Sequence, residues 1–118
     1  MDREVFISAV NTPNAYSEWM GRWRQKVEAT GNRYAQNQEL SQLYGEVLLA
    51  VSIKADGRIQ SIKVLNSSGK PALDGAALNI AEIAGPFEPL PEIIREEVDV
   101  LHITRTWRFT PIGTSVAF

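Results

Sequence analysis

The sequence predicts an α+β domain in which a small three-stranded antiparallel sheet packs against two or more helices. Apolar residues recur at helical spacing within residues 15–29 and 73–84, and they alternate with polar residues within 45–65 and 100–109. A spacing of three to four residues indicates one buried helix face, whereas a period of two indicates a strand with one buried face. The order helix, hairpin, helix, strand therefore predicts helices on one face of an antiparallel sheet.

Length, composition and charge exclude several classes of protein. The chain has 118 residues, 44% of them hydrophobic, which is typical of one globular domain with a core of its own. The net charge of -2 argues against a protein that binds phosphate backbones, because such proteins need a basic face. Without cysteine, the chain has no disulfide and no thiolate ligand or nucleophile. The longest apolar run, residues 47–51, is too short to cross a bilayer.

The N-terminal third predicts a short extended segment followed by a helix. Residues 3–10 (REVFISAV) form an apolar run, so we assign residues 1–12 to an N-terminal arm or edge segment. Thr12 is expected to cap a helix with Pro13 at its first position, and the Gly31 turn is expected to end this helix near residue 30. Its apolar stripe consists of Ala15, Tyr16, Trp19, Met20, Trp23 and Val27. The two tryptophans are expected to pack the helix onto the core.

The middle of the chain predicts a β-hairpin and a second helix. Residues 45–54 alternate, and Asp56–Gly57 is a hairpin signal because glycine adopts positive φ easily. The return strand covers residues 58–65. The residues expected to share the buried face of the first strand are Val47, Leu49, Val51 and Ile53. A helix is predicted over residues 73–84, and the proline-rich, acidic segment from residue 86 is expected to begin irregularly and to lie at the surface.

The last predicted strand, VLHITRTWRF, concentrates the residues that invite a chemical function. Leu101, Ile103, Trp107 and Phe109 share one face, which Arg105 interrupts, and Arg105 is expected to reach out at the margin of that face. We assign residues 13–110 to the main domain, including its first helix at about 13–30, and residues 111–118 to a C-terminal tail.

His102 is the one histidine of the chain, and a nucleophilic triad needs a histidine between a nucleophile and a carboxylate. It lies in the middle of a strand, so no catalytic residue is assigned; an enzyme would require a cleft in which His102 faces a carboxylate. No metal-ligand spacing is present, so no metal or cofactor is predicted. Arg105 and Arg108 flank Trp107, but without a wider basic patch they do not predict a nucleic-acid partner.

Strand pairing is the remaining route to function. The edge of a sheet carries unpaired N–H and C=O groups that can accept a strand from a partner. Thr104 and Thr106 suit such a strand. Two interpretations stay open at this point: the last strand accepts a partner, or it simply completes the sheet.

Three stretches of the sequence carry a family resemblance when they are taken together. They are YGEVLLAVSIKADGRIQSIKVLNSSGKPALDGAAL (residues 44–78), PFEPLP (86–91) and DVLHITRTWRF (99–109). They contain a glycine-led strand, a DG hairpin, an SSG…LD-AA helix and a closing ITRTWxF strand. In this order they resemble the periplasmic C-terminal domain of TonB-family energy transducers, and REVFISA and WRQKVEATGN resemble the upstream part of a long subtype.

The resemblance implies a protein-binding function. In the family, an inner-membrane anchor and a proline-rich linker precede this periplasmic domain, and the anchor couples to a motor of the ExbB/ExbD type. The domain captures the TonB box of an outer-membrane TonB-dependent transporter by strand addition, and it makes or breaks no bond in a substrate. On this sequence, the resemblance places the partner-binding edge at Val100, Leu101, His102, Ile103, Thr104, Arg105, Thr106, Trp107 and Arg108.

A second contact is implied near the end of the first helix. By the resemblance, a loop formed by Asn32, Arg33 and Tyr34 approaches the plug of the transporter. The family usually has proline after this tyrosine, and here the residue is Ala35, so this contact is less well supported than the edge strand. The alternative is a TolA-like envelope scaffold or a self-association domain, in which the same edge pairs with a second copy as a homodimer.

Overall fold

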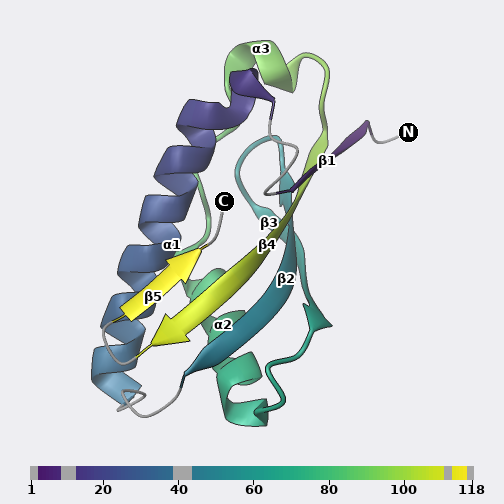
Figure 1. Cartoon of the computed structure of the whole chain (residues 1–118). Helices are drawn as coiled ribbons and strands as arrows, with labels where there is room; N and C mark the ends of the chain where they lie inside the picture. Colours follow the sequence, from purple (N-terminus) through teal and green to yellow (C-terminus); the bar gives the residue numbers. More distant parts are fainter. Residues whose placement is uncertain (1–2, 9–12, 39–43, 111–112, 117–118) are drawn as a thin grey trace.

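The computed structural model describes residues 3–8, 13–38, 44–110 and 113–116 and has an α+β fold (Figure 1). The strands are β1 (Glu4–Ser8), β2 (Gly45–Lys54), β3 (Ile59–Asn66), β4 (Val100–Thr110) and β5 (Gly113–Val116). The helices are a short 3-10 helix η1 (Asn14–Tyr16), α1 (Ser17–Gln38), α2 (Pro71–Ala84) and α3 (Glu92–Arg95). The predicted fold class is confirmed, although the sheet has five strands rather than three.

The sheet is built around β4. The strand order is β1-β4-β2-β3, and β5 pairs with the same edge of β4 as β1 does. β2 and β3 form the predicted antiparallel hairpin, and β2 is antiparallel to β4 along its whole length. β1 is parallel to β4, whereas β5 is antiparallel to it. The N-terminal arm and the C-terminal tail of the prediction thus each contain a strand.

One core lies between the sheet and the helices α1 and α2. Buried residues of both helices belong to a single cluster with the predicted inward faces of β2 and β4. Trp23 of α1 meets Trp107 of β4 edge to face, with ring centroids 6.4 Å apart. The predicted helix stripes and strand faces are buried as expected, except that Ala15 is exposed in η1. Periodicity therefore predicted which side chains form the core.

Helix α1 differs from its prediction at both ends. Pro13 is extended (φ -60°, ψ 147°) and precedes η1, so it is not the first helical residue; Thr12 lies outside the described residues. The helix also continues through Gly31 to Gln38. A Cβ added at Gly31 would lie 2.7 Å from Thr114 Oγ1. This glycine is therefore needed for the close approach of α1 and β5, and not to end the helix.

The segment after α2 is irregular, as predicted, and it is fixed to the hairpin turn. Gly57 has a φ of 96°, which confirms the turn, and its carbonyl accepts a 2.8 Å hydrogen bond from the N–H of Phe87. The N–H of Leu90 donates to the Ala55 carbonyl at 2.9 Å. These backbone bonds hold the proline-rich segment against the end of the sheet, where it can contact α1.

Candidate functional site

The nine residues predicted to bind a partner all lie in β4, from Val100 to Arg108. One edge of β4 pairs with β2 along this whole stretch. The other edge pairs with β1 up to Thr104 and with β5 from Trp107 onward (Figure 1). In the structure this second edge is not free, because β1 pairs with it from Val100 to Thr104 and β5 pairs with it from Trp107 onward.

Arg105 faces the core between the two stretches of β4 that pair with β1 and β5. Only 2% of its surface is exposed, and its Nη1 donates a 2.9 Å hydrogen bond to the carbonyl of Thr104. Burial lowers the pKa of this guanidinium from its usual value, since the charged form loses hydration. The expectation that Arg105 reaches out at the margin is wrong, because its side chain is buried on the same face of β4 as Ile103 and Trp107.

His102 lies on the other face of β4 and joins three strands. Its Nε2 is 2.7 Å from Glu4 Oε1 on β1, and its Nδ1 is 2.6 Å from Ser52 Oγ on β2. The ring of Phe6 stacks on the imidazole, with centroids 4.4 Å apart and planes inclined by 12°. A carboxylate can only accept, so Nε2–H donates to Glu4, and in the neutral ring Nδ1 accepts from the Ser52 hydroxyl.

The order serine, histidine, carboxylate is that of a catalytic triad, but the surroundings do not suit catalysis. Ser52 lies within β2, near its C-terminal end, and is only 5% exposed, while Phe6 stacks on the imidazole ring. A nucleophile must be open to a substrate carbonyl and must face donors for the oxyanion. The three side chains instead connect β1, β4 and β2.

Further polar contacts anchor β1 beside the start of β4. The Asp99 carboxylate accepts hydrogen bonds from the backbone N–H of Arg3 at 2.8 Å and from its guanidinium at 3.1 and 3.2 Å. The Arg3 side-chain hydrogen bond is the main reason that the pKa of Asp99 is lowered to about 2. Ile7 is 2% exposed and is the buried residue of this strand. The Glu4 and Asp99 contacts could not be predicted from the sequence, since they join residues far apart in the chain.

The predicted plug-contacting residues lie in α1 and not in a loop. The Asn32 Oδ1 accepts a 2.9 Å hydrogen bond from the Thr114 N–H of β5, and the Tyr34 hydroxyl accepts one of 3.1 Å from Asn79 Nδ2 of α2. Arg33 is exposed. Residue 35 is alanine, whose N–H allows the helix to continue where proline would interrupt it.

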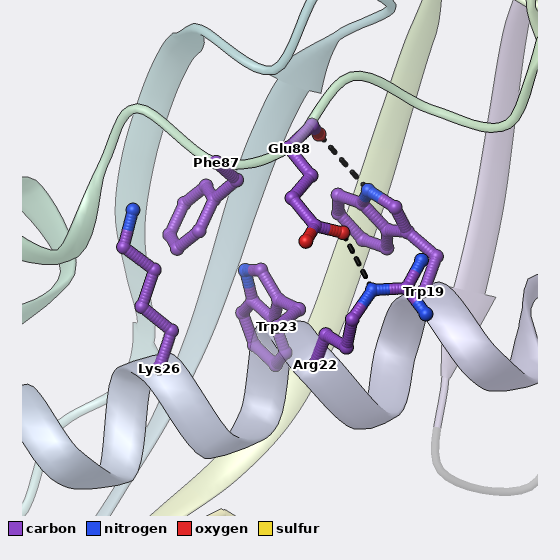
Figure 2. A pocket seen from close by; sticks show the side chains of 6 residues that line it. All are labelled: Trp19, Arg22, Trp23, Lys26, Phe87 and Glu88. Carbon is purple, nitrogen blue, oxygen red and sulfur yellow. Dashed lines mark hydrogen bonds and ion pairs between the residues drawn. The ribbon is translucent and has the colours of Figure 1, made fainter.

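A small cavity of about 150 Å³ lies between α1 and the segment after α2 (Figure 2). Its polar groups bond to one another across it: Trp19 Nε1 donates to the Glu88 carbonyl at 2.9 Å, and Arg22 Nε to the Glu88 carboxylate at 2.5 Å. Lys26 Nζ donates to the Pro86 carbonyl at 2.6 Å and lies over the Phe87 ring. The cavity wall therefore fixes the proline-rich segment to α1. Trp19 is buried as predicted, but its hydrogen bond to Glu88 was not predicted from the sequence.

Within the described residues, no group of three or more histidine, aspartate or glutamate side chains is placed to hold a metal ion. In the same part of the chain, no helix has both the length and the apolar character needed to cross a membrane.

Comparison with known proteins tests the family resemblance. The family described as "Gram-negative bacterial TonB protein C-terminal" matches residues 30–111. The chain belongs to this family. Curated relatives include Protein TonB from two strains of Helicobacter pylori, which are 35% and 34% identical to this chain over 68 residues. The match covers 58% of this chain and spans 24% of the length of each relative.

Solved structures show the same fold. One solution structure of the Helicobacter pylori TonB C-terminal domain matches with a TM-score of 0.60 and 26% identity, covering 83% of this chain and 85% of that chain. Another, of a shorter segment, matches with a TM-score of 0.53 and 24% identity, covering 85% of this chain and 97% of that chain. The α+β fold is thus that of TonB C-terminal domains.

Proposed function

We propose that the chain is the periplasmic domain of an energy transducer that captures an outer-membrane TonB-dependent transporter by strand addition to β4. The transducer is anchored in the inner membrane and coupled to an ExbB/ExbD-type motor. The domain holds the TonB box of the transporter while proton-motive force does mechanical work on the plug. It is not an enzyme, and it needs no cofactor.

Family membership and the properties of β4 support this proposal. The observation that carries it is that the outer edge of β4 accepts a strand of only five residues, β1, from a distant part of the sequence. Backbone pairing supplies affinity to such an edge, and side chains on alternate positions supply selection. β4 is itself held in the sheet by its pairing with β2 and by the buried side chains of Leu101 and Ile103. β4 can therefore stay in place when a strand on its outer edge leaves or joins.

The second proposed contact is the plug of the transporter with residues at the C-terminal part of α1. Arg33 is exposed there, next to Tyr34 and Ile83, which line a shallow cavity with it. An exposed arginine and an adjacent apolar surface are typical of residues that contact a protein partner. Arg33→Ala is expected to weaken binding of the transporter's plug domain while leaving binding of an isolated TonB-box peptide unchanged.

Peptide titration tests strand addition. Peptides from the N-termini of TonB-dependent transporters should shift the backbone amide signals of β4 and β1 in a labelled sample. Shifts confined to α1 would contradict the proposal.

Sedimentation velocity at several concentrations tests the alternative of a self-association domain. A tight homodimer would favour the scaffold if β4 is protected in it and if no transporter peptide dissociates it.

A further inference from the structure

Strand β1 occupies β4 in the manner expected of a bound peptide. It pairs with β4 alone among the described strands, in parallel, from Glu4 opposite Val100 to Ser8 opposite Thr104. By contrast, β2 pairs with β4 along ten residues and carries a continuous buried face. β1 is therefore the more weakly held of these two neighbours of β4.

The contacts of β1 identify the chemistry that this stretch of β4 selects. At one position a carboxylate, from Glu4, meets His102; three residues later an aliphatic side chain, Ile7, enters the core. A basic residue, Arg3, precedes the carboxylate and meets Asp99. The polar contacts lie at the surface, since the side chains of Arg3 and Glu4 are 53% and 45% exposed. Another extended segment with the same residue types can make the same contacts.

We infer that β1 is an internal substitute for the partner's strand, and that the partner binds β4 by displacing it. This inference rests on the proposed function of strand addition to β4. The partner is an extended peptide, parallel to β4, with a carboxylate at the position of Glu4 and an aliphatic residue at the position of Ile7. Because β1 must leave first, the apparent association constant is the intrinsic one multiplied by the fraction of molecules in which β1 has left.

A reversible cross-link tests the displacement. Ser8 and Thr104 lie opposite each other, and paired strands are separated by a distance that a disulfide spans. The chain has no cysteine, so Ser8→Cys/Thr104→Cys creates a single possible bridge. The probe is a synthetic peptide with the sequence of residues 3–8, REVFIS. We expect the oxidised protein to bind this peptide at least about tenfold more weakly than the reduced protein, with the amide spectrum confirming that both are folded.

The outcomes separate the inference from the function on which it rests. If the oxidised and reduced proteins bound REVFIS equally well, the inference that the peptide displaces β1 would be wrong. Strand addition could then occur only at another edge of the sheet. If neither redox state nor the unmodified protein bound REVFIS or a transporter peptide, the proposed function would fail, and the inference with it.

Two further measurements examine the same inference without the cross-link. Ile7→Ala loosens β1, so the apparent affinity for REVFIS should rise about tenfold; Ile93→Ala, at a 73% exposed position on α3, is the matched control and should change nothing. An unchanged or lower affinity in a folded Ile7→Ala protein would contradict the inference.

The peptide RKVFIS should bind about tenfold more weakly than REVFIS, since lysine replaces the carboxylate that meets His102; equal affinity would refute the assigned register.

Discussion

His102 Nε2 lies 2.7 Å from Glu4 Oε1, while Nδ1 of the same ring lies 2.6 Å from Ser52 Oγ. One imidazole therefore connects β1, β4 and β2 on the face of the sheet opposite the core. This arrangement explains how a five-residue strand stays in register on β4 with only Ile7 fully buried.

His102→Phe should keep the stacking on Phe6 and remove both hydrogen bonds. The Ser52 hydroxyl is then buried without its partner, which costs about 1–3 kcal/mol of the free energy of unfolding. Hydrogen exchange of the β1 amides should become faster. The double variant Ser52→Ala/His102→Phe should recover part of the loss, because the unpaired hydroxyl is gone. Urea unfolding measures both effects, and an unchanged stability in His102→Phe would contradict the connecting role.

Replacing Gly31 by alanine should destabilise the protein, although alanine favours a helix by about 1 kcal/mol. The new methyl group would lie 2.7–2.9 Å from three side-chain atoms of Thr114, which β5 holds in place. We expect a net loss of about 1–2 kcal/mol in the free energy of unfolding. Gly21→Ala is the matched control on the same helix, since its added Cβ has no atom within 4 Å other than those of its chain neighbours and of the helix backbone around it, and it should stabilise by up to about 1 kcal/mol. Stabilisation of equal size in both variants would show that β5 moves aside freely.

The contact between Arg3 and Asp99 should make the attachment of β1 sensitive to acid. A carboxyl whose pKa is lower in the folded state contributes stability above its unfolded value, near 3.8, and this contribution is lost as the pH falls toward 2. Asp99→Asn should therefore be less stable than the native protein at pH 7, and the difference should vanish near pH 2. Glu82→Gln on α2 removes one exposed carboxylate as a control. A difference between the native protein and Asp99→Asn that does not change with pH would contradict the assignment.

The cavity beside α1 predicts a difference between two tryptophans. Trp19 Nε1 donates to the Glu88 carbonyl, whereas Trp23 Nε1 has no hydrogen-bond partner within the described residues. Both indoles are nearly fully buried, so replacement by phenylalanine removes comparable volume. Trp19→Phe should therefore cost about 0.5–1.5 kcal/mol more than Trp23→Phe in thermal or urea unfolding. If Trp23→Phe were the more costly change, the hydrogen bond to Glu88 would not be what fixes the proline-rich segment.

Particular residues show what could be predicted from the sequence. The alternation at Val47, Leu49, Val51 and Ile53 depends on neighbours two residues apart, and the structure buries all four. The turn at Asp56–Gly57 and the stripe of α2 are local in the same sense. The family followed from the order of such local patterns. The nine residues assigned to the partner-binding edge do lie in one strand, β4, but its neighbours β1 and β5 could not be predicted from them.

The sequence by itself determined the α+β class, the hairpin, the buried faces and the family. Only the tertiary structure decided that β1 lies parallel on β4, that β5 pairs with the C-terminal end of the same edge, and that α1 continues through Gly31. Periodicity shows which face of a strand is buried, but it carries no information about which strand lies beside it. Those neighbours are chosen by contacts such as Glu4 with His102, which join residues 98 positions apart in the chain.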